Sequence, residues 1–277
     1  MTAAGGRYLE AAGELLRRVH DTQGESIADA SRRCADAIAA DGLVHLFGSG
    51  HSRIPVEEMF PRYGSFPGFN PIVELSMTFH TQVVGANGQR QAMFIERVEG
   101  LAERILANFV LAPPDVMVVF SVGGMTAVPI EMAQGARQRG LPVVAVTSVA
   151  QSLARQPTHS SGTRLLDHAD VVVDLCTPVG DALITVDGLD APISPGSTLV
   201  AVAIANEMKA QTAMLLQERG ALPPVLTSPA LVGREASAAL FDAAYGEHAR
   251  RLARALSSRQ PGARAAPDGA TSPAIGL

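Results

Sequence analysis

Two short segments rich in glycine and hydroxyl side chains have the composition of an anion-binding site. The first reads Gly48-Ser49-Gly50-His51-Ser52 and the second reads Ser121-Val122-Gly123-Gly124-Met125-Thr126. Glycine permits tight turns, backbone N–H groups at the start of a helix point toward an anion, and serine and threonine add hydroxyl donors. We therefore expect one phosphate group to lie between the two segments. The residues predicted to hold it are Ser49, Gly50, Ser52, Ser121, Gly123, Gly124 and Thr126.

Other phosphate-binding and nucleophile motifs fail on particular residues of the first segment. A dinucleotide-binding fingerprint requires a third glycine where Arg53 stands, and a nucleophile elbow around Ser52 requires glycine where Ile54 stands. A P-loop requires Gly-Lys followed by serine or threonine, which the chain lacks. A Gly-Ser-Gly turn also occurs as a purely structural connection, so this segment alone leaves that alternative open.

Acid–base candidates lie in and just after the first segment. Glu58 lies one to two turns into the helix expected after Ser52, so we predict that its carboxylate faces the ligand as a general base while Glu57 faces solvent. His51 lies inside the segment, where a ring nitrogen could donate to phosphate or move a proton on the ligand. For Glu57 and Glu58, the alternative is that both are ordinary surface charges with no catalytic role.

More distant candidates are His80 and His159, which lie in loop-like stretches. Each could reach a pocket or a neighbouring subunit, and for each a hydrogen-bonded structural histidine is the alternative. Glu96 is a reserve candidate for the base, because ion pairing with nearby arginines would explain it equally well.

The elements that position these residues follow from apolar patterning. Buried parallel strands are predicted at Leu43–Phe47, Val116–Phe120, Val143–Val146 and Val171–Leu175, with Ile72–Glu74 as a weaker fifth. Helices are expected over residues 7–40, with a break at Gly24, and over 53–63, 92–110, 126–139, 197–219 and 233–257. This alternation predicts a doubly wound α/β sheet. Ligands of such sheets bind beyond the carboxyl ends of the strands, where both glycine-rich segments lie.

Composition excludes several classes of protein. A net charge of −5 and a pI of about 5.8 lack the excess of Lys and Arg typical of nucleic-acid-binding proteins. Cys34 and Cys176 have no ligand-like spacing, so we expect neither a disulfide framework nor a metal site, and no other cofactor. No apolar run approaches the ~20 residues of a membrane helix and no signal-like start occurs, so we expect a cytoplasmic protein with no membrane segment.

One domain is expected over residues 1–257, with an N-terminal helical arm. Residues 258–277 lack apolar periodicity and are rich in Pro, Gly and Ala, so we expect a disordered tail. Lys209 is the only lysine of the chain, so a Schiff-base mechanism would depend on that residue alone.

Several stretches taken together resemble the SIS (sugar isomerase) family, and within it the single-domain bacterial group called UPF0309. These stretches are Phe47–Ser52, Asn70–Glu74, Glu96–Gly100, Ser121–Ala133, Val144–Ser148, His159–Gly162 and Pro178–Ala182. The resemblance covers roughly residues 7–250. It implies a flavodoxin-like, five-stranded parallel sheet, a homodimer with the active site near the subunit interface, and a phosphosugar ligand. Gly123 departs from the family pattern, which usually has serine there, so phosphate would depend more on backbone N–H groups, Ser121 and Thr126.

The resemblance leaves three activities open, because all three occur on this fold. We expect proton abstraction at C2 of an opened hexosamine 6-phosphate, such as N-acetylglucosamine 6-phosphate, followed by elimination from C3. An aldose-ketose isomerase and a non-catalytic sugar-phosphate sensor are the alternatives. Phosphoheptose-type isomerases carry a histidine near the position of Asn206, which weakens simple isomerisation. The chain has no basic helix-turn-helix segment to support a sensor.

Overall fold

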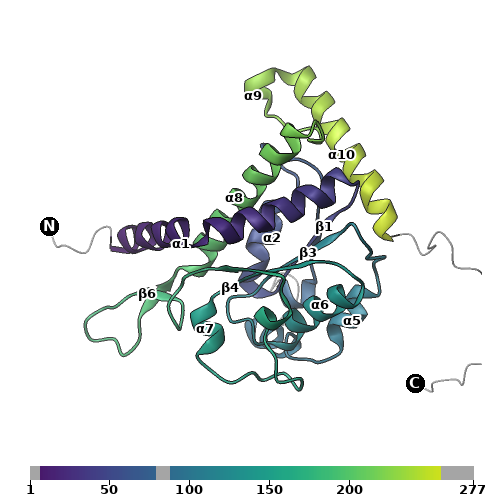
Figure 1. Ribbon diagram of the computed structural model, residues 1–277. Coiled ribbons are helices and arrows are strands. Elements are labelled where there is room, and N and C mark those ends of the chain that lie inside the picture. Colours follow the sequence, from purple (N-terminus) through teal and green to yellow (C-terminus); the bar gives the residue numbers. More distant parts are fainter. Residues whose placement is uncertain (1–6, 79–87, 257–277) are drawn as a thin grey trace, which may run out of the picture.

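The centre of the protein is a five-stranded parallel sheet (Figure 1). The computed structural model describes residues 7–78 and 88–256. The strands lie in the order β2 (Phe69–Ile72), β1 (Val44–Gly48), β3 (Val116–Phe120), β4 (Val143–Thr147) and β5 (Val171–Asp174), and all neighbours are parallel. This order is that of flavodoxin-like sheets. The predicted α/β fold class is therefore confirmed.

Helices flank the sheet on both sides (Figure 1). The helices in the described ranges are α1 (Arg7–Ala39), α2 (Arg53–Met59), α3 (Leu75–Thr78), α4 (Gly88–Ile95), α5 (Leu101–Leu106), α6 (Ala127–Gln138), α7 (Val149–Leu153), α8 (Ser197–Glu218), α9 (Pro229–Val232) and α10 (Arg234–Leu256). Short 3₁₀ turns occupy Gly50–Ser52 and Leu165–His168. An antiparallel hairpin of β6 (Ala182–Ile184) and β7 (Ile193–Pro195) precedes α8.

Alternate side chains of each strand pack into different helical layers, because successive strand residues point to opposite faces. Val118 and Phe120 of β3 belong to the cluster formed with α1, α2 and α8. Met117 and Val119 belong to the cluster formed with α5 and α6. Every residue of β1, β3 and β4 is buried. The near-continuous apolar runs of the sequence therefore reflect strands that are covered on both faces.

The predicted break of the first helix at Gly24 is wrong, because α1 is continuous from Arg7 to Ala39. A glycine inside a helix costs only about 1 kcal/mol relative to alanine. Buried side chains on both sides of Gly24, including Val19 and Ile27, pack against α8 and hold the helix together.

The predicted helix over residues 92–110 is also wrong as a single element. It is two helices, α4 and α5, separated by a turn in which Gly100 has φ 84°, a value that favours glycine. The helix predicted over 53–63 ends at Met59, because Phe60 precedes Pro61 and is extended. The fifth strand lies slightly earlier than predicted, at Phe69–Ile72, where Pro71 is tolerated in an edge strand.

The C-terminal helix α10 is anchored at the amino ends of the strands, away from the edge where ligands bind. Arg251 donates to the carbonyl oxygens of Ile38 and Gly42 at 3.0 and 2.8 Å. Arg254 forms an ion pair with buried Asp115. The extent of the domain and the disorder of the C-terminal tail remain predictions, since the tail lies outside the described residues.

One helix in the described ranges, α8, is long and apolar enough to cross a membrane by length and composition. It packs against α1 and α2, and Val200, Ile204 and Met208 are buried in the core. Core helices of globular domains have the same length and composition.

Candidate functional site

A cleft of about 410 Å³ lies where the loops after β1 and β3 meet. Its wall contains every residue predicted to hold phosphate: Ser49, Gly50, Ser52, Ser121, Gly123, Gly124 and Thr126. The volume lies within the range of about 300 to 1,000 Å³ that is usual for small-ligand sites. The remaining wall comes from α4, α7, the β6–β7 region and the start of α8.

The first glycine-rich loop turns tightly because of its glycines. A Cβ on Gly48 would lie 2.2 Å from the carbonyl oxygen of Ser52, and Gly50 has φ 56°. Ser49 donates its hydroxyl hydrogen to Glu96 Oε2 at 2.8 Å. The hydroxyl hydrogen of Ser49 is therefore committed to a carboxylate, which leaves Ser52 as the serine of this loop with the better opportunity to donate to an anion.

The second loop has one constrained glycine and one with space around it. Gly124 has φ 59°, and a Cβ there would lie 3.0 Å from Thr147 Oγ1. A Cβ on Gly123 would meet nothing closer than 3.8 Å, at Gln151 Nε2 and Met125 Cε. Both of those residues line the cleft, so a side chain at position 123 would point into it.

Glu58 does not lie among the described residues that line the cleft. Its side chain points toward α8, where Oε1 accepts from Asn206 at 3.3 Å and lies 3.8 Å from Lys209 Nζ. Its other oxygen accepts from Arg62 at 2.9 Å. Lys209 also donates to the backbone carbonyl oxygen of Glu58 at 3.0 Å. Burial lowers the pKa of the Lys209 amine. Glu57 is exposed, as the helix position suggested.

Among the glutamates that the structure describes, Glu96 is the one that lines the cleft. It is 47 residues from Ser49 in sequence, and the hydrogen bond between them brings the end of α4 against the first loop. The backbone carbonyl of Glu96 also accepts from Val128 N at 3.0 Å, which fixes it to the start of α6. This position of Glu96 was not expected, because the sequence predicted one helix over residues 92–110 and therefore no turn at Glu96.

The three predicted histidines have different positions. His51 lines the cleft. His159 lies away from it and contacts Glu131 of α6, with 3.3 Å between Nε2 and Oε1. His80 lies outside the described residues.

Residues of the far wall were missed by the sequence analysis. Asp181 caps α8 by accepting from Ser197 N at 2.8 Å and from Ser197 Oγ at 2.6 Å. Gln151 accepts from Gly180 N at 3.1 Å, which orients its amide in the wall. In the described ranges, Arg155 is the only arginine or lysine that lines the cleft. These far-wall residues follow β4 and β5 in the sequence. Because ligands of parallel sheets bind beyond the carboxyl ends of the strands, that position could have identified them as candidates.

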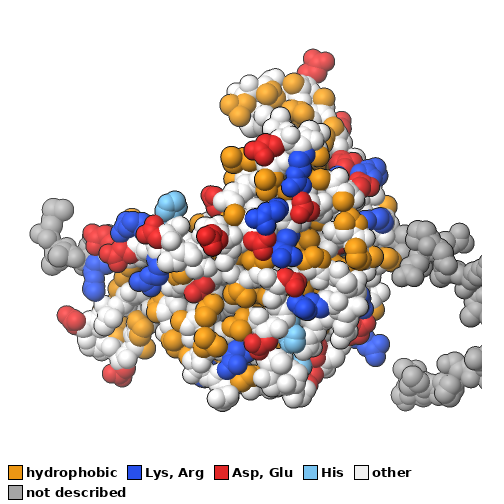
Figure 2. Space-filling view, in the orientation of Figure 1, with side chains coloured by type: hydrophobic (Ala, Val, Ile, Leu, Met, Phe, Trp, Pro, Cys, Tyr) orange, Lys and Arg blue, Asp and Glu red, His pale blue; other side chains and the backbone are white. Residues whose placement is uncertain are grey.

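Apolar side chains are exposed on the α9–α10 region, which projects from the body of the molecule (Figure 2). Leu231 is 81% exposed and Phe241 is 40% exposed. The rings of Phe241 and Tyr245 stack with 4.4 Å between their centroids. Phe241 and Tyr245 therefore form an exposed aromatic pair on α10.

Comparison with known proteins gives consistent relatives. A family model described as SIS domain matches residues 7–148. A UPF0309 protein of Streptomyces coelicolor is 37% identical over 242 residues, which are 87% of this chain and 95% of that protein. A UPF0309 protein of Listeria monocytogenes is 31% identical over 221 residues, covering 80% of this chain and 87% of that protein.

Solved structures resemble the chain more distantly. A phosphoheptose isomerase from Francisella tularensis has a TM-score of 0.49 at 12% identity, covering 77% of this chain and 100% of that one. The NanR protein of Vibrio vulnificus, complexed with ManNAc-6P, has a TM-score of 0.43 at 16% identity, covering 76% of this chain and 61% of that one. Similarity at this level carries no argument about activity.

Proposed function

Because this chain belongs to the SIS domain family, we propose that its cleft binds a sugar phosphate and processes it chemically. The observation that carries the proposal is the meeting of the two glycine- and hydroxyl-rich loops in one wall, each directly before a helix. The phosphate would accept hydrogen bonds from backbone N–H groups of both loops and from Ser52, Ser121 and Thr126.

We propose Glu96 as the general base, in place of Glu58. Glu96 lies in the cleft and is held by Ser49, next to the expected phosphate. Glu58 is engaged by Arg62, Asn206 and Lys209 on the α8 side. A carboxylate that abstracts a proton must reach the substrate at about hydrogen-bond distance, and Glu96 has the better geometry.

The reaction we propose is elimination on a hexosamine 6-phosphate such as N-acetylglucosamine 6-phosphate. The Glu96 carboxylate takes the proton from C2 of the open-chain sugar, and the C2 electron pair forms the C2–C3 double bond. Hydroxide leaves C3 and takes a proton from an acid, for which His51 is the candidate in the cleft wall. Isomerisation begins with the same abstraction and differs in returning the proton to C1.

A homodimer in the cytoplasm is part of the proposal. It is supported by the family resemblance and by the exposed apolar side chains of α9 and α10. Sedimentation of the full chain at the mass of one copy would count against the dimer.

Mass analysis tests the activity. The purified protein is incubated with hexose, hexosamine and N-acetylhexosamine 6-phosphates, and the products are separated and weighed. Loss of one water from a hexosamine 6-phosphate supports elimination. An unchanged mass with a new chromatographic peak means isomerisation, and binding without turnover means a sensor. Absence of both binding and turnover across the panel contradicts the proposal.

A further inference from the structure

Arg155, which follows α7, presents its guanidinium group at the wall of the cleft. The residue is exposed and lines the cleft. Across residues 7–78 and 88–256, its side chain has no hydrogen-bond or ion-pair partner. A guanidinium carries five N–H donors and a permanent positive charge. The group is therefore available to a ligand that carries negative charge.

The backbone at Arg155 is held in place, although the side chain is exposed. Arg164 donates to the backbone carbonyl oxygens of Ser152 and Arg155, at 2.9 and 3.0 Å. Ser152 belongs to α7, so the two bonds from Arg164 fix Arg155 relative to the end of that helix. The cleft therefore receives a cationic side chain from a positioned backbone.

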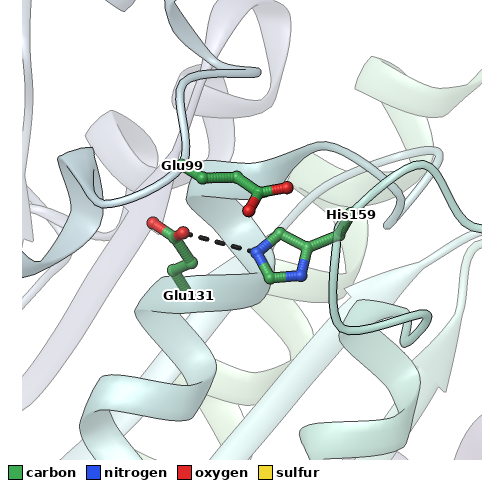
Figure 3. Close-up of side chains that lie close together, drawn as sticks. All are labelled: Glu99, Glu131 and His159. Carbon is green, nitrogen blue, oxygen red and sulfur yellow. Dashed lines mark hydrogen bonds and ion pairs between the residues drawn. The ribbon is translucent and has the colours of Figure 1, made fainter.

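The loop that continues from Arg155 is fastened to two other elements. His159 Nδ1 accepts from Ser161 N at 3.1 Å, so His159 carries its proton on Nε2 and donates it to Glu131 Oε1 at 3.3 Å (Figure 3). Ser160 N donates to Glu99 Oε1 at 2.8 Å. Since Glu131 belongs to α6 and Glu99 lies between α4 and α5, these bonds anchor the loop on both sides.

Contacts on either side of Arg155 place it beside the second glycine-rich loop. A Cβ on Gly123 would lie 3.8 Å from Gln151 Nε2. Thr158 donates its hydroxyl hydrogen to the backbone carbonyl oxygen of Met125 at 3.0 Å. Arg155 lies between Gln151 and Thr158 in the sequence and lines the same cleft. Its guanidinium therefore belongs to the part of the wall where the phosphate is proposed to bind.

The charges of the wall favour a cation at the phosphate. A phosphate monoester carries about −1.5 to −2 charges at pH 7. The two loops supply neutral donors, and the wall also contains the carboxylates of Glu96 and Asp181. Hydrogen bonds from Ser49 and Ser197 orient these two carboxylates without removing their charge. Among the described arginines and lysines of the wall, Arg155 alone can offset the negative charge of the ligand.

We propose that Arg155 binds the phosphate group directly and makes the cleft select dianionic phosphate monoesters. This inference rests on the proposed binding of a sugar phosphate. A guanidinium can donate two parallel N–H bonds to two phosphate oxygens, which adds charge and geometric specificity to the neutral donors of the loops. A monoanionic sulfate ester of the same shape gains less from the same cation, because the attraction is proportional to the charge.

Calorimetry of the full chain with N-acetylglucosamine 6-phosphate and N-acetylglucosamine 6-sulfate tests this role. Arg155→Gln should weaken binding of the phosphate ester by about 10- to 100-fold, because a hydrogen bond to a charged group is lost. The same change should narrow the preference for phosphate over sulfate, and Arg155→Lys should recover part of that preference, because it keeps the charge. The matched control is Arg104→Gln, an exposed arginine of α5 outside the cleft, which should leave both affinities unchanged.

The outcomes separate this inference from the proposed function. Absence of phosphosugar binding by the wild type would contradict the proposed function, and this inference with it. The role of Arg155 alone is overturned if the wild type binds and Ser52→Ala weakens binding, but Arg155→Gln lowers the affinity by less than about 10-fold. Attraction between exposed charges without a direct contact accounts for up to about 5-fold. A preference for phosphate over sulfate that is equal in wild type and Arg155→Gln would also overturn it.

Discussion

Replacing Gly123 by serine should strengthen phosphate binding. The backbone at Gly123 is outside the left-handed region, and an added Cβ meets no atom closer than 3.8 Å. The Cβ points toward cleft residues Gln151 and Met125, so a hydroxyl on it would be available to a bound phosphate. A hydrogen bond to a charged group contributes about 1.5 to 3 kcal/mol, which corresponds to about 10- to 100-fold in affinity.

Calorimetric titration of Gly123→Ser with a hexosamine 6-phosphate measures this gain. Gly123→Ala is the matched control, because it adds the same Cβ without the hydroxyl and should leave the affinity close to that of the wild type. Gly124→Ala should instead lower stability, since Gly124 has φ 59° and its Cβ would lie 3.0 Å from Thr147 Oγ1. Equal affinities of the serine and alanine variants would refute the placement of phosphate at the second loop.

Three further substitutions test other parts of the account. Ser52→Ala should weaken sugar-phosphate binding by about 10- to 100-fold in calorimetry, and unchanged affinity would remove Ser52 from the site. Glu96→Gln should lower turnover by about 10²- to 10⁴-fold with binding largely retained, whereas Glu57→Gln should be nearly silent, and full turnover by Glu96→Gln would exclude it as the base. Asp115→Asn should lower the free energy of unfolding in urea by about 1.5 to 3 kcal/mol, because Asp115 accepts from His45 and Leu43 N; unchanged stability would contradict this.

Asp115 also predicts a pH dependence of stability. Burial raises its pKa, but hydrogen bonds from His45 and Leu43 N and the charge of Arg254 outweigh burial and hold the pKa below its usual value. A lowered carboxyl pKa stabilises the folded state fully above the unfolded-state pKa of about 3.9, and the contribution is lost as the pH falls through the folded-state pKa. Urea unfolding at a series of pH values should show a smaller loss below about pH 4 in Asp115→Asn than in the wild type. Parallel losses in the two proteins would contradict this assignment.

The sheet was predictable because its central strands are covered on both faces and are apolar almost throughout. The meeting of the two glycine-rich loops in one cleft wall was predictable because both follow strands of the same parallel sheet, whose ligands bind beyond the carboxyl ends of the strands. The break predicted at Gly24 is wrong, since packing of α1 along α8 outweighs the local cost of one glycine. Helical spacing could not reveal that Glu58 faces Lys209, because that depends on where α8 lies.

Contacts between distant segments were the other part that the sequence concealed. Glu96 meets Ser49 across 47 residues, and Glu131 meets His159 across 28 residues. Neither pair has a spacing signal along the chain, because each contact joins segments that only the fold brings together. The sequence did not predict that α7 and α8 contribute to the cleft wall, for the same reason.

Binding of a sugar with and without its phosphate tests the central claim most directly. Calorimetry of the wild type with N-acetylglucosamine 6-phosphate and with N-acetylglucosamine, under identical conditions, isolates the contribution of the phosphate group. We predict that N-acetylglucosamine 6-phosphate binds measurably and that N-acetylglucosamine does not. Replacing Ser52 by alanine should lower the affinity for the phosphorylated sugar by about 10- to 100-fold. Equal binding of the two sugars, or phosphosugar affinity that is independent of Ser52, would contradict a phosphate site built from these loops.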